Sequence, residues 1–392
     1  ITNFMNMKRN ISIQLSKLKH HLIKYKILNS YITKYYNKNY EKELKQLLAT
    51  INECDNVDID NDIPVNDILI GLVEINKNKI RLSPKRENYY KYKKFLDYNS
   101  LKYETFNIHT SDWLEKVVNY DIIIWGMDSD PASLYEEKTK IYFIEKYLNK
   151  LCYPSAEELW AYEDKIRQYY ILKQNNMPIV PTFITFDKKE ALHYIDNAKF
   201  PKVAKLNNSS GSRGVTLVKN KSKAKKIINK VFADGRKTPY TYTKQKDYIL
   251  FQDFINDAEY DLRVIIIGDK VFGYYRIKPK NDFRASGAGI YEKKELPVDA
   301  VKIALNVKKL FNARMIAVDM INSKKTNQHY IIEASIFFGV DTPEQLKINN
   351  IPGYYKINSY DEIEGFFPGR YWVQELTLNE VLKEYKNKIQ LK

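Results

Sequence analysis

Two acidic residues, Asp319 and Glu333, lie in strand-like runs of apolar residues, RMIAVDMI (314–321) and HYIIEAS (329–335). The polar stretch NSKKTNQ between the runs allows the two strands to pair antiparallel, which would bring the carboxylates close together. Two partly buried carboxylates repel each other and raise the pKa of one of them. A divalent cation would remove this conflict, and oxygen ligands favour Mg²⁺ or Mn²⁺ with nucleotide phosphates. The alternative is two acids on an exposed sheet face, against which the apolar flanks argue.

A loop of small residues, NNSSGSRG (207–214), follows an apolar strand that carries Lys205. Small residues such as Ser210, Gly211 and Ser212 let backbone N–H groups approach an anion, and Arg213 adds positive charge. A buried lysine also needs a partner, and a nucleotide phosphate would serve. By itself the loop is weak support, because a Gly/Ser turn between two strands is usually a hairpin.

The run ILFQDFI (249–255) has the features of an adenosine site. The strand edge from Gln252 through Asp253 and Phe254 to Ile255 can offer main-chain groups to an adenine edge. The acid that follows, Asp261, can accept a hydrogen bond from a ribose hydroxyl.

Three arginines occur downstream of this run. Three cations converging near a metal would stabilise a transferring phosphoryl group or bind a substrate carboxylate. They are Arg263 in YDLR, Arg276 in YYRIK and Arg284 in DFRASGAG.

The elements that must position these residues form an α/β (α+β) pattern. From residue 67 onward, strand-like and helix-like runs alternate, which predicts a small parallel α/β domain up to about residue 150. Asp128-Ser129-Asp130-Pro131 follows its third strand; a plain turn is favoured there over a ligand site. A helix is expected over 160–178, and the rest is α+β with much antiparallel sheet, including a hairpin at Gly268-Asp269.

These patterns divide the chain into four segments. We expect an N-terminal helical extension and linker (1–62), an α/β domain (63–155), a segment with the Gly-rich loop (156–250) and a segment with the acidic site and a C-terminal cover (251–392). Apolar stripes at 15–25 and 40–48 indicate helices in the extension, which more often pack than bind membranes.

Composition limits the setting of the protein. The net charge of +16 favours an anionic partner, although the abundance of Lys, Asn, Ile and Tyr also suggests an AT-rich coding bias. Two cysteines, at 54 and 152, exclude a disulfide scaffold and indicate a reducing, cytoplasmic compartment. The sequence has no apolar run of about 18 residues and no signal-peptide pattern. The oligomeric state is open, a homodimer included.

The ordered series of motifs over roughly 160–342 resembles the ATP-grasp superfamily, most closely the RimK-type carboxylate–amine ligases and the glutathione-synthetase-like enzymes. The matching stretches are FPKVAK, SSGSRG, QDFI, DLRVIIIGD, DFRAS, VDM, EAS and EDKIRQYY. The resemblance implies an ATP-grasp fold, two α+β subdomains that clasp ATP, preceded by a small parallel α/β domain and the helical extension.

The resemblance also assigns roles to residues. Lys165 and Lys205 would hold ATP phosphates, Asp253 and Phe254 would face adenine, and Asp261 would face ribose. Asp319 and Glu333 would hold magnesium. The sequence departs from the family at Ser335, where Asn usually supplies a further metal ligand, and a Ser hydroxyl is a poorer one.

Four function classes follow in order of preference. The first is an ATP-dependent carboxylate–amine ligase that forms an amide through an acyl phosphate, with a carboxylate substrate and an amine acceptor (a small molecule, a peptide or a glycan-linked group). The second is a kinase of the same fold acting on a small anionic acceptor such as an inositol phosphate or a sugar. The third is a nucleotide-binding protein with weakened catalysis, and the fourth, a nucleic-acid binder, lacks any supporting motif.

Overall fold

The computed structural model describes residues 26–60, 63, 68–76, 84, 87–209, 213–240, 242–278, 290–338, 343 and 346–390. The chain divides into two compact units, residues 1–53 with 77–87, and residues 54–76 with 88–392. The first unit contributes helix α2 (Lys26–Asn52), which includes the predicted helix at 40–48. The predicted stripe at 15–25 lies outside the described residues. No helix within the described ranges is both long and apolar enough to cross a membrane.

The second unit begins with the predicted parallel α/β domain, and its sheet has the strand order β2-β1-β3-β4. All four residues of β1 are buried, as expected for a parallel sheet covered on both faces. The strands are β1 (Ile70–Val73), β2 (Tyr103–Phe106), β3 (Ile122–Ile124) and β4 (Leu151–Tyr153); the helices are α3 (Tyr89–Tyr98), α4 (Trp113–Val117) and α5 (Pro131–Leu148).

Helix α5 was not predicted from the sequence, although its start carries clear signals. Asp130 accepts a hydrogen bond from the backbone N–H of Ser133 (3.1 Å), and Pro131 occupies the first helical position. The segment Asp128 to Pro131 therefore leads into a helix, and is not the plain turn that the sequence favoured.

The small antiparallel sheet has the order β5-β10-β6-β7, and helices α8 and α9 pack on it. The predicted helix at 160–178 is two helices, α6 and α7, because Asp164 caps α7 by accepting from the backbone N–H of Arg167 (2.9 Å). The elements are α6 (Ala156–Ala161), α7 (Lys165–Gln174), β5 (Thr182–Thr185), α8 (Lys188–Asn197), β6 (Lys202–Lys205), β7 (Val215–Val218), α9 (Lys221–Val231), the hairpin β8 (Arg236–Lys237) and β9 (Lys244–Gln245), and β10 (Ile249–Asp253).

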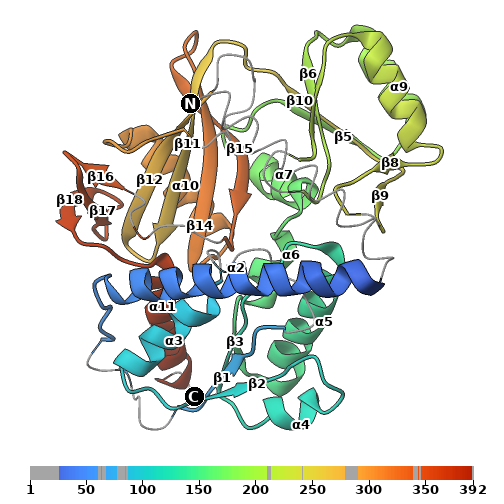
Figure 1. Cartoon of the computed structure of the whole chain (residues 1–392). Helices are drawn as coiled ribbons and strands as arrows, with labels where there is room; N and C mark the ends of the chain where they lie inside the picture. Colours follow the sequence, from blue (N-terminus) through green and yellow to red (C-terminus); the bar gives the residue numbers. More distant parts are fainter. Residues whose placement is uncertain are drawn as a thin grey trace. The chain divides into compact units, whose positions relative to one another are not determined.

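The large sheet follows the order β15-β14-β11-β12-β17-β16, and α10 covers one face of its centre (Figure 1). Gly268 has φ +55 in the β11–β12 turn, which confirms the predicted hairpin. The elements are β11 (Ala258–Ile267), β12 (Lys270–Ile277), β13 (Tyr291–Glu292), α10 (Val298–Leu310), β14 (Met315–Ser323), β15 (Gln328–Ser335), β16 (Lys347–Ile348), β17 (Ile351–Ile357), β18 (Ile363–Pro368) and α11 (Val373–Gln390).

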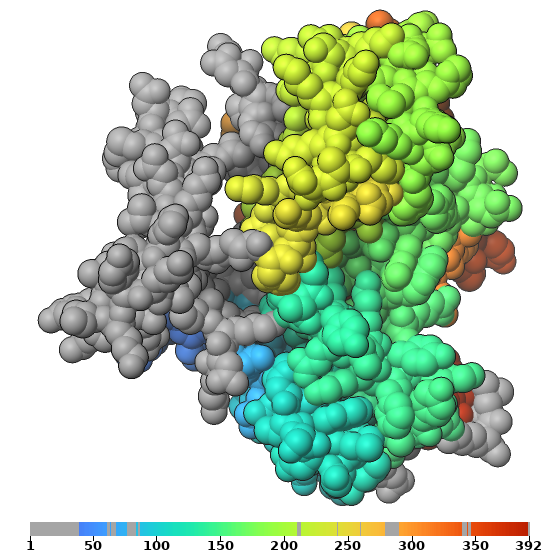
Figure 2. Space-filling model, turned by 90° about the vertical axis from the view of Figure 1, so that its right-hand side faces the viewer, coloured from blue at the N-terminus to red at the C-terminus, as the bar shows by residue number. Residues whose placement is uncertain are grey.

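Backbone hydrogen bonds join the small sheet to the large one. The N–H of Val180, just before β5, donates to the carbonyl of Ile331 in β15 (3.1 Å). The N–H of Ile331 donates to the carbonyl of Pro178 (2.7 Å). Where the chain leaves the small sheet, the N–H of Asp253 donates to the carbonyl of Pro181 (2.8 Å). On the face drawn in Figure 2, the green-to-yellow atoms of the small-sheet region meet the teal atoms of the α/β domain.

Candidate active site

The predicted pairing of the two acidic strands is confirmed. Strands β14 and β15 are antiparallel, and Asp319 lies directly opposite Glu333 beside a β-bulge. On the other side of β14, Arg263 of β11 lies opposite Asp319. Because paired residues in a sheet share a face, Ser335, two residues beyond Glu333, is on that face too. The register thus collects the charged side chains on one face of the large sheet.

Asp319 is held by two arginines. Its carboxylate accepts from Arg263 Nε (2.7 Å) and Nη2 (2.8 Å), and Arg276 Nη2 is 2.9 Å away. Arg276 also donates to Asp261. Burial alone would raise the pKa of Asp319, but Arg263 and Arg276 hold it well below its ordinary value. At Asp319 the two arginines therefore outweigh any repulsion between the acids, so Asp319 is not an acid whose pKa is raised.

Glu333 has a different partner. Lys165 Nζ lies 2.9 Å from Glu333 Oε1 and donates to the carbonyl of Ser209 (2.8 Å). Lys165 thus joins the start of α7, the acid on β15 and the first part of the Gly/Ser loop. Lys205 is also buried, and burial lowers its pKa to about 8, an effect that Glu333 partly offsets.

These groups border a pocket with about 370 Å³ of open space between the two sheets. Its charged lining is Lys165, Lys205 and Glu333, and Gln252 adds an amide. Its apolar lining comes from α7, β10, β15 and the segment before β5: Leu172, Ile179, Leu250, Ile331 and Ile332. A pocket lined by both apolar side chains and charged groups suits a ligand that has a ring and an anionic group.

Other predicted nucleotide residues are placed differently. Asp253, Phe254 and Ile255 do not line this pocket, and the carboxylate of Asp253 forms an ion pair with Lys202. Asp261 lies with Arg276 on the charged face of the large sheet.

The Gly/Ser loop is described at its two ends. Ser210, Gly211, Ser212 and Arg284 lie outside the described residues. At the ends, Ser209 is buried, and a Cβ on Gly214 would come within 2.1 Å of Ser209 Oγ. Only glycine fits at that close approach.

The carboxylates suit a hard cation that takes part of its coordination from a ligand. Across the described ranges, no three His, Cys, Asp or Glu side chains form a group that could hold a metal ion. Asp319 and Glu333 supply two facing carboxylates, and Mg²⁺ commonly binds one or two carboxylates plus phosphates. The donor set therefore fits magnesium only together with a phosphate ligand.

Sequence reasoning missed Gln168, which fixes the pocket wall. Its Oε1 accepts from the backbone N–H of Ala334 (3.2 Å), and its Nε2 donates to the carbonyl of Ala161 (3.0 Å). This buried amide ties α7 to β15 beside Glu333. No local pattern marks such a residue, because both of its partners are backbone groups in other elements.

Comparison with known proteins identifies this arrangement. A family model described as the RimK-like ATP-grasp domain matches residues 162–351. The chain carries a RimK-like ATP-grasp domain. The predicted family is thus confirmed. The fold is confirmed by the crystal structure of D-alanine–D-alanine ligase from Bacillus anthracis complexed with ATP (TM-score 0.52, 16% identity), which covers 83% of this chain and 99% of that chain.

Curated relatives of the ATP-grasp chain are ligases. Alpha-aminoadipate–LysW ligase LysX of Saccharolobus solfataricus is 27% identical over 206 residues, 51% of this chain and 66% of the relative. Glutamate–LysW ligase ArgX of Sulfolobus acidocaldarius is 26% identical over 181 residues, 45% of this chain and 61% of the relative. The match spans less than two thirds of either relative.

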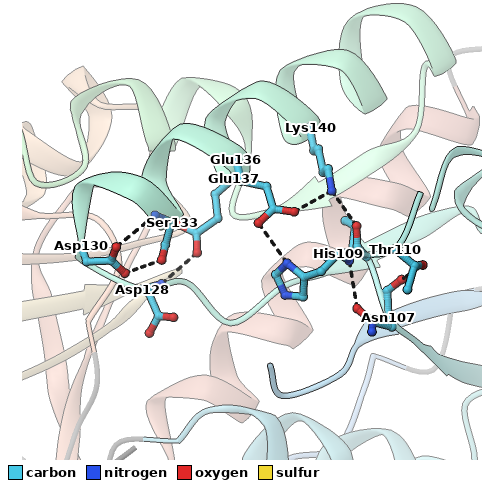
Figure 3. Close-up of polar contacts among 10 residues, drawn as sticks. Asn107, His109, Thr110, Asp128, Asp130, Ser133, Glu136, Glu137 and Lys140 are labelled. Atoms are coloured by element: carbon cyan, nitrogen blue, oxygen red, sulfur yellow. Dashed lines mark hydrogen bonds and ion pairs between the residues drawn. The ribbon is translucent and has the colours of Figure 1, made fainter. Parts of the chain in front are cut away.

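A second polar network lies within the α/β domain and joins the loop after β2 to helix α5 (Figure 3). His109 Nδ1 is 2.9 Å from Glu136 Oε2, and Lys140 Nζ donates to Glu136 Oε1 (2.6 Å) and to the carbonyl of Ile108 (2.7 Å). These contacts fasten α5 to the loop after β2, so we interpret the network as structural.

Proposed function

We propose that the chain is an ATP-dependent carboxylate–amine ligase that forms an amide through an acyl-phosphate intermediate. The observation that carries the proposal is that two lysines and one acid line one pocket, with a second acid on the adjoining strand. Lys165, Lys205 and Glu333 line it, and Asp319 lies opposite Glu333 on the next strand. The names of the curated relatives, ligases of aminoadipate or glutamate with LysW, support the same reaction class.

The pocket divides the nucleotide between its apolar and charged parts. Leu172, Ile179, Leu250 and Ile331 would enclose the adenine ring, and Gln252 would bind its polar edge. Lys165 and Lys205 at the charged end would bind phosphates. The Gly/Ser loop would add backbone N–H groups to the same anion.

The charged face of the large sheet would serve the transfer step. Asp319 and Glu333 would hold Mg²⁺ (or Mn²⁺) together with the ATP phosphates, and Ser335 would add a weaker hydroxyl ligand. When bound, the ion neutralises phosphate charge and makes the γ-phosphoryl group a better electrophile. Arg263 and Arg276, on the same face, would stabilise the anionic acyl phosphate.

Trapping with hydroxylamine tests this function. The protein is incubated with ATP, Mg²⁺, hydroxylamine and a panel of amino acids, dicarboxylates and short peptides, and hydroxamate and ADP are measured. We expect both products with at least one carboxylate, and their loss in Glu333→Gln. The surface variant Asp196→Asn is the control, because Asp196 pairs with Lys221 (2.8 Å) and both side chains are exposed. A stable phosphorylated product without hydroxamate would refute the ligase and indicate a kinase; ATP binding without turnover would indicate a nucleotide-binding protein.

A further inference from the structure

Gln252 and Thr182 form a side-chain pair in the wall of the pocket. They lie directly opposite each other on the antiparallel strands β10 and β5, so their side chains share one face of the small sheet. Both residues line the pocket. Gln252 Nε2 is 3.2 Å from Thr182 Oγ1, and Thr182 Oγ1 is 2.7 Å from the carbonyl oxygen of Val180. The two contacts thus run from the amide of Gln252 through the hydroxyl of Thr182 to the backbone.

These two contacts fix the orientation of the Gln252 amide. A threonine hydroxyl has one hydrogen, and the shorter contact takes it, because the carbonyl of Val180 can only accept. Toward Gln252 the hydroxyl oxygen therefore acts as an acceptor, and the amide atom that faces it must be the donor Nε2. In the reversed amide, Oε1 and Oγ1 would meet as two acceptors without a hydrogen between them, which costs free energy.

The other side of the amide is left for a ligand. Oε1 of Gln252 accepts no hydrogen bond from the residues that the structure describes, and it is not enclosed among them. Nε2 keeps a second N–H, because an amide nitrogen carries two hydrogens and Thr182 binds one. The pocket wall therefore presents one acceptor and one donor in a fixed order. The hydroxyl of Tyr169, another lining residue, donates to the carbonyl of Thr182 (3.1 Å) and fastens β5 to α7.

We propose that Thr182 sets the base specificity of the nucleotide site by holding the Gln252 amide in this orientation. The inference rests on the ATP site of the proposed function and deepens it. Adenine has a donor, its 6-amino group, beside a ring nitrogen that accepts, and this order matches Oε1 and the N–H of Nε2.

A 6-oxo purine, such as guanine or hypoxanthine, places an acceptor against Oε1. Only the reversed amide would match its carbonyl and the adjacent ring N–H. The contact with Thr182 disfavours that reversal, because it would bring two acceptor oxygens together. Thr182 is thus a positioning residue, which acts on the base through Gln252 and selects a 6-aminopurine.

Binding of three nucleotides to the full chain tests this proposal. ATP, inosine triphosphate (6-oxo) and purine riboside triphosphate (no group at C6) are titrated in the presence of Mg²⁺ by isothermal titration calorimetry. The wild type should prefer ATP to inosine triphosphate. Thr182→Val keeps the shape of the side chain but removes the hydroxyl, and the preference should fall roughly tenfold or more, the scale of one mismatched buried acceptor. The fall should come mainly from tighter binding of inosine triphosphate, because the amide can then reverse. The affinity for purine riboside triphosphate should change little.

Two variants serve as controls. Thr182→Ser keeps the hydroxyl and should keep the wild-type preference. Thr185→Val is the matched control, because Thr185 is on the same strand but does not line the pocket. Its hydroxyl contacts the carboxylate of Glu190 and accepts from the backbone N–H of Asp187 (3.0 Å), so its loss perturbs the strand without touching Gln252. If Thr182→Val fails to fold, Thr182→Ala replaces it and removes the same hydroxyl.

An unchanged preference in Thr182→Val overturns the inference. An equal loss of affinity for ATP and inosine triphosphate also overturns it, since a merely structural role would weaken both nucleotides alike. The same fall in preference in Thr185→Val would overturn it as well. A failed hydroxylamine test together with the expected preferences refutes the ligase and leaves the inference standing. A wild type that binds none of the three nucleotides refutes the proposed function, and the inference with it.

Discussion

Replacement of Asp319 by asparagine should destabilise the protein in the absence of ATP and magnesium. The side chain of Asp319 is only 10% exposed, and its two oxygens accept from Arg263 at 2.7 and 2.8 Å. Asparagine keeps the shape but loses the charge and presents an NH₂ group to a donor. If the repulsion between Asp319 and Glu333 were the main effect, the substitution would instead stabilise the protein.

The structure sets the magnitude. Breaking a buried ion pair from one side costs about 3–5 kcal/mol, because the remaining charge stays buried. Arg276 keeps Asp261 as a partner, so Arg263 alone is stranded, and we expect the lower end, about 3 kcal/mol. The pKa of Asp319 is depressed in the folded state, so its contribution is present above the ordinary carboxyl pKa and lost as pH falls through the folded value.

Urea unfolding at neutral pH, followed by tryptophan fluorescence and circular dichroism, measures this loss. Asp196→Asn, which removes one side of an exposed pair, should leave the unfolding midpoint unchanged. In a double-mutant cycle, Asp319→Asn combined with Arg263→Gln should cost less than the sum of the single changes. An Asp319→Asn midpoint equal to or above that of the wild type would show that the arginines do not hold this acid.

Two pH-dependent predictions follow from buried groups. Burial lowers the pKa of Lys205 to about 8, so the affinity for ATP should fall as pH rises through 8 and Lys205 loses its charge. In Lys205→Arg this fall in affinity should disappear, because arginine stays charged, and a pH-independent affinity in the wild type would contradict the role of Lys205. Burial raises the pKa of Glu375 to about 7, although Lys94 lies 3.1 Å away. The stabilising contribution of Glu375 is therefore present below its unfolded pKa and lost as pH rises through 7. In thermal unfolding, Glu375→Gln should gain stability relative to the wild type between pH 5 and 8, and parallel pH profiles of the two proteins would disprove this.

Local patterns in the sequence were enough to predict the strands that carry the acids. Alternation in RMIAVDMI and HYIIEAS, with a polar linker between them, predicted that Asp319 and Glu333 lie close together, and the structure makes them direct partners across the two strands. Gly268 marked the hairpin turn, because a left-handed backbone conformation favours a residue without a side chain. Helix α5 could have been predicted too, since Asp130 and Pro131 form a standard helix start.

The partners of the acids could not be predicted in this way. Arg263 meets Asp319 only because β11 pairs with β14 in one register, and the two residues are 56 positions apart. Nothing local fixes the register of distant strands. The motifs placed Lys165 near phosphates but not against Glu333, since that contact depends on the packing of α7 on β15. The family resemblance predicted which residues bind the nucleotide and the metal. Only the structure shows that Asp319 pairs with Arg263 and that Glu333 pairs with Lys165.

The hydrogen bond from Asp253 to Pro181 has a mechanical consequence. The small sheet is one continuous stretch of chain, which enters at Pro181 and leaves at Asp253, and this bond ties entry and exit together. The two crossings between the small sheet and the rest of the chain therefore lie side by side. Leu250 of β10 and Ile331 of β15 both line the pocket, so a rotation of the small sheet about these crossings would change the width of the pocket without breaking a strand. Such a rotation would also strain the hydrogen bonds of Tyr240 with Ser129 and of Tyr242 with Asp130.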